Sequence, residues 1–383
     1  MRLLVSPGAF SGALSALAVA AAVERGWRRT APDTVVHVRP MSDGATGLLD
    51  AVHAARGGRL VSLTARGPLG DPVPATLLHV PGQAGGTVYV EAGQVLGQQL
   101  TPSGEELRHA EHGSSVGLAE LLLAGREVGA GRIVVGLGTA TTHDGGAGLV
   151  RGLAGVPEDA EIDRDALAAA HRTLAATDVV VASATQTPLL GLHGAGALLG
   201  ERVGPAEAQR LDTRVGDLVA RLDRLGRDLP RRSVLPTAPA AGATHGPTTH
   251  QHAVPARPGR AEGSGAGGGA AYALTVLGGR LLPGPDVVAD AVGLRAAVAD
   301  ADLVLTATAV LDAPAVDFSV VATVGRAAME EGLPVVVLAE EVHTSRREVA
   351  RAGISGTYET GPADLAVVEE WALRLARTWA LGA

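Results

Sequence analysis

The pattern of apolar and polar positions changes along the chain, and both ends alternate between strand-like and helix-like segments. Apolar runs of strand length are followed by segments with apolar side chains at helical spacing. Ser15 is a residue type that begins helices, and it precedes the first amphipathic segment. The predicted strands at the two ends cover residues 2–7, 34–41, 301–310 and 333–341, and the predicted helices cover residues 15–30, 47–58, 320–332 and 362–382.

The middle of the chain has a different pattern. Residues 59–80 and 86–93 contain short apolar runs separated by Pro-Gly turns, which is typical of antiparallel strands. Further along, residues 114–129 and 205–226 have helical spacing, and residues 132–138 and 177–191 begin with buried-strand runs.

This order of elements predicts an α/β protein with a discontinuous domain. We expect a doubly wound, Rossmann- or flavodoxin-like domain made from residues 1–65 and 284–383, because βα alternation occupies both chain ends. Residues 66–283 are expected to form a second α/β domain, inserted in the first. Within the insertion, residues 229–269 are rich in Pro, Ala, Gly and His, so most of them are predicted to form a mobile loop.

The loop carries His245, His250 and His252, which suggest either a metal site or solvated side chains. No acid or cysteine stands at ligand spacing near them, which favours solvated histidines over a metal site. The glycine-rich stretch at residues 263–274 looks like a turn that enters a helix. Its helix N-terminus could bind an anion, or its glycines could serve close backbone packing.

Composition narrows the classes of function. The 383-residue chain has 40 acids and 32 bases, a net charge of −8, so nothing indicates a nucleic-acid-binding surface. It has no cysteine and no lysine, which excludes thiolate chemistry and a Walker-type lysine. We expect neither a signal peptide nor a membrane helix, because the first apolar stretch is short and interrupted. The predicted location is the cytoplasm.

One segment, GLGTATTHDGGAGL at residues 136–149, combines glycines, threonines and an acid after a buried strand. Ligand sites of α/β sheets gather in such strand-to-helix loops. Asp144 could accept a proton as a general base, or it could cap the following helix through backbone N–H groups. Thr142 could donate to a phosphate, or only pack. His143 could be an acid–base group, or a surface loop residue.

Two further acids are candidates. Asp43 follows a predicted strand and could bind Mg²⁺ or substrate, or stabilise an Asp-Gly turn. Asp312 could be a metal or substrate ligand, or a turn residue before Pro314.

The chain resembles the glycerate kinase family, in its two-domain bacterial type, over nearly its whole length. The loop at residues 136–149 is similar to that family's most recognisable motif. Four other segments are similar to family motifs in the same order: residues 6–52, 65–75, 187–195 and 263–274. The resemblance implies the discontinuous two-domain fold predicted above.

The resemblance also shows where this chain departs from the family pattern, mostly at charged motif positions. Gly8 stands where the family has Asp, and Ser11 where it has Lys. Seven further motif positions also differ: Thr46 replaces Glu, Ala184 and Gln186 each replace Asp, Thr308 replaces Glu, Val310 replaces Arg, Pro314 replaces Gln, and Ser319 replaces Lys. The glycines and apolar residues of the motifs are kept.

By resemblance, the expected activity is phosphorylation of glycerate by Mg-ATP, with Asp144 and Asp43 as catalytic residues. The substrate- and phosphate-binding residues would be Gly44, Thr142, Gly145, Gly146 and Asp312. The replaced Lys, Arg and Glu favour an alternative, a non-catalytic member that binds a small metabolite or a protein partner. A third possibility is a different enzyme acting on a small acid in the same cleft.

Overall fold

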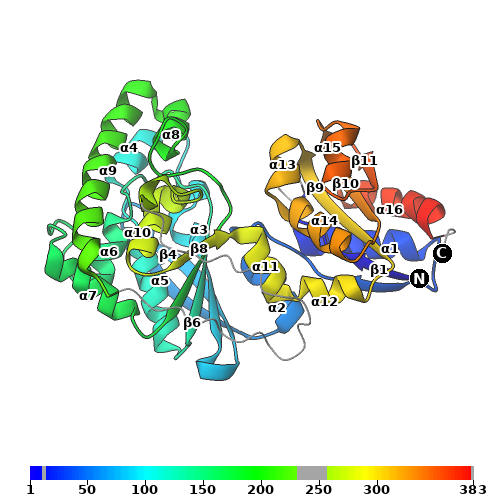
Figure 1. Cartoon of the computed structure of the whole chain (residues 1–383), viewed down its shortest axis with the longest axis horizontal. Helices are drawn as coiled ribbons and strands as arrows, with labels where there is room; N and C mark the ends of the chain where they lie inside the picture. The colour runs from blue at the N-terminus through cyan, green and yellow to red at the C-terminus, as the bar shows by residue number, and fades with distance from the viewer. Residues whose placement is uncertain (11–13, 231–256, 381–383) are drawn as a thin grey trace.

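The computed structural model describes residues 1–10, 14–230 and 257–380. It contains two β-sheets, one in each of two lobes (Figure 1). Both ends of the described chain lie in one lobe, and the middle of the chain forms the other. This arrangement confirms the predicted α/β fold with a domain assembled from both chain ends.

The first sheet has five parallel strands in the order β11-β10-β9-β1-β2. The order reads 2-1-3-4-5 along the chain, which is the flavodoxin-like arrangement. Its strands are β1 (Arg2–Val5), β2 (Val35–Val38), β9 (Leu303–Leu311), β10 (Val335–Val342) and β11 (Gly356–Glu359). The short β11 was not among the predicted strands.

Helices cover both faces of this sheet. On one face, α1 (Ala16–Arg28) and α16 (Leu365–Trp379) pack against each other and on Leu3 and Val5 of β1. Leu4, between them, points to the opposite face, in the cluster that contains α14 (Val320–Glu330). As predicted, Ser15 begins α1, because its hydroxyl accepts a hydrogen bond from the N–H of Ala18.

The second sheet has six strands in the order β3-β4-β5-β6-β7-β8. The pairs β3–β4 and β4–β5 are antiparallel, as predicted, and the remaining pairs are parallel. The strands are β3 (Arg59–Arg66), β4 (Pro72–Val80), β5 (Thr87–Glu91), β6 (Arg132–Leu137), β7 (Asp178–Ser183) and β8 (Arg280–Pro283).

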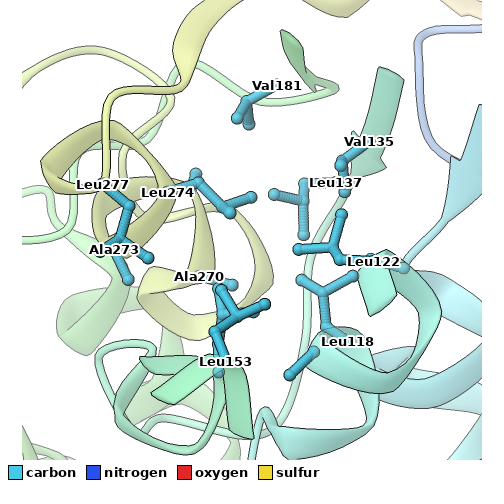
Figure 2. Packing of buried hydrophobic residues seen from close by; sticks show 14 of the residues in the cluster. Leu118, Leu122, Val135, Leu137, Leu153, Val181, Ala270, Ala273, Leu274 and Leu277 are labelled. Atoms are coloured by element: carbon cyan, nitrogen blue, oxygen red, sulfur yellow. The ribbon is translucent and has the colours of Figure 1, made fainter. Parts of the chain in front are cut away.

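One face of the six-stranded sheet carries the largest apolar core. Leucines and alanines of α5 (Val116–Glu127), α6 (Ala147–Ala154) and α10 (Ala270–Val276) pack there on β6 and β7 (Figure 2). Because the alanine side chains of α10 are small, the backbone of α10 can lie close to the sheet. The other face is covered by α2 (Leu48–Arg56) and α11 (Gly284–Val292), which lie between the two lobes (Figure 1).

The described residues form further α-helices in both lobes. They are α3 (Gly93–Leu96), α4 (Glu106–His112), α7 (Arg164–Leu174), α8 (Ala195–Val203), α9 (Pro205–Leu225), α12 (Leu294–Ala299), α13 (Ala313–Asp317) and α15 (Arg346–Arg351). Short 3₁₀ turns are η1 (Gln83–Gly85), η2 (Gln98–Leu100), η3 (Gly226–Asp228), η4 (Pro258–Arg260) and η5 (Ala266–Gly269). No helix of the described part of the chain is long and apolar enough to cross a membrane.

Strand pairing divides the chain slightly differently from the predicted boundaries. The boundary placed at residues 65 and 66 falls at the end of β3, although all of β3 pairs in the six-stranded sheet. Of the loop predicted at residues 229–269, residues 231–256, with His245, His250 and His252, lie outside the described residues. Residues 257–269 are described, and they form η4 and η5 and pack into the inserted domain.

Candidate active-site cleft

A cleft of about 510 Å³ opens between the two sheets. One wall is built from segments that follow β1 and β2, from β9 and from the start of α14. The other is built from α3 and η2, from the loop after β6 and from Gly267. Because parallel strands of both sheets direct their carboxyl ends here, the cleft lies where α/β proteins usually bind ligands.

Asp43 is the one predicted acid that lies in the cleft wall. Its Oδ1 accepts a hydrogen bond from the N–H of Ala45 at 2.9 Å, so the predicted Asp-Gly turn is present. The Asp43 side chain is exposed to the cleft, although protein atoms surround its carboxyl closely. This desolvation raises the pKa of Asp43 above its usual value, against the lowering effect of the Ala45 hydrogen bond.

The cleft wall also brings together positions at which the sequence departs from the family pattern. They are Gly8, Thr46, Ala184, Thr308 and Ser319, which come from five separate segments. In the family pattern each of these positions carries a charge. In the described part of this chain, Asp43 is therefore the single charged side chain of the cleft wall.

Two of these positions have structural roles that suit the residues now present. The hydroxyl of Ser319 accepts a hydrogen bond from the N–H of Ala322 at 3.3 Å and caps α14. Gly8 lies against Val320, and a Cβ atom at Gly8 would be 3.2 Å from the Val320 Cβ. A side chain at Gly8 would therefore require Val320 to shift slightly.

Asp144 does not line the cleft. Its carboxylate accepts hydrogen bonds from the N–H and the hydroxyl of Ser115, at 2.9 and 2.7 Å, and from the N–H groups of Gly146 and Gly148, at 2.9 and 3.0 Å. The acid thus joins the N-terminal turns of α5 and α6. This geometry supports the capping alternative, and a catalytic role for Asp144 stays a prediction.

The neighbours of Asp144 are packed rather than exposed to the cleft. Thr142 is buried, and its Oγ1 has no hydrogen-bond partner in the described residues. Gly145 and Gly146 have positive φ, and Gly146 approaches Ala273 so closely that a Cβ atom would lie 2.4 Å from the Ala273 Cβ. These glycines serve helix packing, and their predicted role in phosphate binding stays untested.

Gly44 and Asp312 also lie outside the cleft wall. Gly44 has a φ of 100°, and a Cβ atom there would be 2.6 Å from the Cα of Gly284. It thus allows the segment after β2 to contact α11. Asp312 caps α13, because its Oδ1 accepts a hydrogen bond from the N–H of Ala315 at 2.8 Å. The observed contact supports the turn alternative for Asp312.

The glycine-rich segment serves both packing and the cleft. Gly267, Gly268 and Gly269 all have positive φ, and a Cβ atom at Gly268 would be 1.8 Å from the carbonyl oxygen of Thr142. Close backbone packing, one of the two predicted alternatives, is therefore present. The opposite side of the segment borders the cleft at Gly267.

A smaller pocket of about 150 Å³ adjoins the cleft, and the two share Gln98, Thr139 and Ala140. The sequence alone did not identify this pocket. Its wall includes Arg202, from α8, and His143. Their separation in sequence explains why no local pattern could have found it.

His143 is buried rather than on the surface, with 2% of its area exposed. Its Nε2 lies 3.8 Å from Oδ1 of Asp212 on α9, which is longer than a hydrogen bond. Neither atom has another partner in the described residues. The surface alternative for His143 is therefore wrong, and its side chain lies between the pocket and an acid.

The cleft has few groups that fit a magnesium–nucleotide complex. No cluster of three or more His, Asp or Glu side chains that could hold a metal occurs in the described ranges. Arg326, which follows the motif near the start of α14, donates to Asp286 at 2.7 Å instead of reaching the cleft. The described residues of the cleft wall thus provide one carboxylate and no cation for such a complex.

Comparisons with known proteins agree over the full length of the chain. The model of the Glycerate kinase family matches residues 3–374. An uncharacterised protein of Mycobacterium tuberculosis is 32% identical over 356 residues, covering 92% of this chain and 82% of the relative. The Glycerate kinase of Bacillus subtilis is 29% identical over 379 residues, covering 94% of this chain and 91% of the relative.

A solved structure has the same fold. The crystal structure described as that of a glycerate kinase 2 from Salmonella typhimurium LT2 superposes with a TM-score of 0.77 at 26% identity. The match covers 100% of this chain and 99% of the other. Both lobes and their connection are therefore shared with that protein.

Proposed function

Because the chain belongs to the glycerate kinase family, we propose that its cleft binds a small hydroxylated metabolite of the glycerate type and that phosphoryl transfer from ATP has been lost. The observation that carries the proposal is the convergence of replaced charges on one surface. Five positions that are charged in the family pattern line the cleft as Gly8, Thr46, Ala184, Thr308 and Ser319.

The chemistry of phosphoryl transfer explains why these replacements matter. The reaction depends on positioning and on neutralising the charge of the phosphates, usually with Mg²⁺ and a Lys or Arg side chain. The described wall of the cleft offers Asp43, hydroxyl groups and the amides of Gln98 and Gln99. A carboxylate, hydroxyls and amides can bind hydroxyl groups of a ligand, but they do not neutralise a triphosphate.

Within this proposal the remaining polar groups bind and orient a ligand. Asp43 lines the cleft, where its carboxylate accepts a hydrogen bond from a ligand hydroxyl. The hydroxyl of Ser42 already donates to the carbonyl oxygen of Thr46 at 3.0 Å and accepts from the N–H of Gly44 at 3.1 Å. Ser42 thereby holds the turn that presents Asp43 to the cleft.

A second candidate is an active glycerate kinase. The observation that favours it is Asp43 itself, since a carboxyl with a raised pKa, placed in the cleft, is suited to accept a proton from a substrate hydroxyl. The similarity to the Bacillus subtilis Glycerate kinase, which is 29% identical and covers 94% of this chain, is consistent with this candidate. This candidate requires cationic groups from outside the described wall.

The deciding experiment measures ATP consumption by the purified chain with D-glycerate and Mg²⁺. The Asp43→Asn variant, prepared identically, reports contaminating kinase. We expect the two preparations to be equal and far below the usual kinase range of roughly 1–100 s⁻¹. Turnover within that range, abolished by Asp43→Asn, would overturn the proposed loss of activity and establish the second candidate.

Ligand binding is tested separately by thermal unfolding. A ligand that binds only the folded chain raises the unfolding midpoint. We expect glycerate or a related polyol to raise it in the wild type and not in Asp43→Asn, and we expect Mg-ATP to leave it unchanged. Stabilisation by Mg-ATP would contradict the proposal.

A further inference from the structure

The pocket beside the cleft has the features of a separate binding subsite. It is continuous with the cleft through Gln98, Thr139 and Ala140, and its volume of about 150 Å³ suits a group of a few heavy atoms, since a water molecule occupies roughly 30 Å³ in the liquid. It lies within the inserted domain, away from Asp43. Unlike the cleft wall, its wall contains a cation.

The cation is Arg202, on the last turn of α8. Its Nη2 donates to Oε1 of Gln98 at 2.9 Å, so the guanidinium lies across the boundary between the pocket and the cleft. A guanidinium has five N–H donors in a planar arrangement. The bond to Gln98 engages one of them and leaves the others available to a ligand.

Hydroxyl groups supply further donors. Thr139, Thr141, Thr185 and Thr187 all line the pocket. Thr185 Oγ1 donates to Thr187 Oγ1 at 2.9 Å. The Thr187 oxygen accepts this bond, so its own hydrogen can be directed to an acceptor in the pocket. Thr141 is 2% exposed, which places its side chain in the inner wall.

Two acids lie near the pocket, and neither neutralises it. Asp212 is 3.8 Å from Nε2 of the buried His143, and it does not line the pocket. Glu201 is exposed at the rim and opposes the binding of an anion. The pocket therefore combines the guanidinium of Arg202, threonine hydroxyls and an imidazole with one rim carboxylate.

We propose that this pocket is an oxyanion subsite, in which Arg202 binds the phosphate or carboxylate end of a ligand whose hydroxylated part lies in the cleft. Arg202 on α8 thereby supplies the positive charge that the described cleft wall lacks. The subsite goes beyond the proposed function, because anion binding can be measured without any turnover. It therefore stands or fails independently of phosphoryl transfer.

The test uses the full chain and inorganic phosphate at constant ionic strength, with binding measured by calorimetry and by the shift in unfolding midpoint. We expect saturable binding by the wild type. Arg202→Gln should weaken it roughly ten- to hundred-fold, the cost of a charge-assisted hydrogen bond. Glu201→Gln should strengthen binding, because it removes the opposing charge.

The matched control is Arg224→Gln, which removes an exposed arginine of α9 that does not line the pocket. It should bind phosphate as the wild type does. The absence of saturable binding by the wild type would overturn the subsite. Equal weakening by Arg202→Gln and Arg224→Gln would also overturn it, because only net charge would then matter.

Competition identifies the source of the anion. Glycerate, a polyol phosphate and ADP are each titrated against bound phosphate in the wild type and in Arg202→Gln. Displacement by glycerate or the polyol phosphate, weakened by Arg202→Gln, identifies the anionic end of a small metabolite. Stronger displacement by ADP, weakened in the same way, assigns the subsite to a nucleotide phosphate. If none of the three depends on Arg202, the proposed ligand role of the pocket is wrong.

Discussion

Asp144 shows how one side chain can hold two helices. Its carboxylate accepts four hydrogen bonds, two from Ser115 and one each from the N–H groups of Gly146 and Gly148. The hydroxyl oxygen of Ser115 also accepts a hydrogen bond from the N–H of Leu149 at 2.9 Å, which links Ser115 to α6. Loss of the carboxylate therefore leaves several partly buried donors without a partner.

We predict that Asp144→Ala lowers the free energy of unfolding by roughly 2–4 kcal/mol, more than a simple cap, because several partners lose their acceptor together. Asp144→Asn should cost less, since its amide oxygen keeps part of the acceptor capacity. Urea unfolding followed by far-UV circular dichroism measures both. Unchanged stability in Asp144→Asn, with loss of glycerate-induced stabilisation, would instead support the catalytic or ligand-binding role.

At the scale of elements, the glycine-rich segment is fixed by packing. We predict that Gly268→Ala lowers the thermal midpoint by several degrees or prevents folding, because a Cβ atom would be 1.8 Å from the Thr142 carbonyl oxygen. The control is Gly204→Ala, where φ is also positive, at 90°, but nothing lies within 4 Å of the added Cβ. Equal effects of the two substitutions would show that backbone strain, rather than close packing, accounts for the glycine.

The elements were largely predictable because their signals are local. Long apolar runs gave the central strands, and Ser15 marked the start of α1. The short strands β8 and β11 were missed, since four residues carry too little pattern and their pairing depends on distant strands. Likewise, the packing of residues 257–269 depends on the carbonyl of Thr142, which lies far away in sequence.

The site was predictable only in part, for the same physical reason. Asp43 could be proposed because it comes just after the predicted strand at residues 34–41, and it lies in the cleft wall. The choice between capping and catalysis for Asp144 could not be made, because its partner Ser115 lies 29 residues earlier. Arg202 lines the pocket only because of where α8 packs in the fold, and the spacing of apolar residues along the chain does not indicate that position.

At the scale of the whole molecule, the two sheets share one apolar core. Residues of α2 and α11 form a single cluster with Val134 and Val180 of the six-stranded sheet and with Leu4 and Val304 of the five-stranded sheet. A polar contact reinforces it, because the N–H of Leu49 donates to Oε1 of Glu91 at 2.9 Å and connects α2 to the end of β5. The cleft walls are therefore held by a continuous core.

This shared core predicts that the two lobes unfold together. All three tryptophans, Trp27, Trp371 and Trp379, lie on α1 and α16 of the five-stranded lobe, so their fluorescence reports that lobe, whereas far-UV circular dichroism reports the whole chain. We expect the two urea transitions to coincide. Separate transitions in the wild type would show that the lobes are independent folding units.

Leu48 gives the sharpest test, because this fully buried side chain of α2 belongs to the shared core and packs on β6 of the six-stranded sheet, which carries no tryptophan. We predict that Leu48→Ala lowers the free energy of unfolding by about 2–5 kcal/mol and shifts both transitions equally. Leu60→Ala, at a 52% exposed position of the edge strand β3, should shift neither by much. If Leu48→Ala moved the circular dichroism transition and left the fluorescence transition in place, the core would not couple the lobes. The cleft would then be free to open without unfolding either sheet, and its walls would be joined as a hinge rather than as a rigid unit.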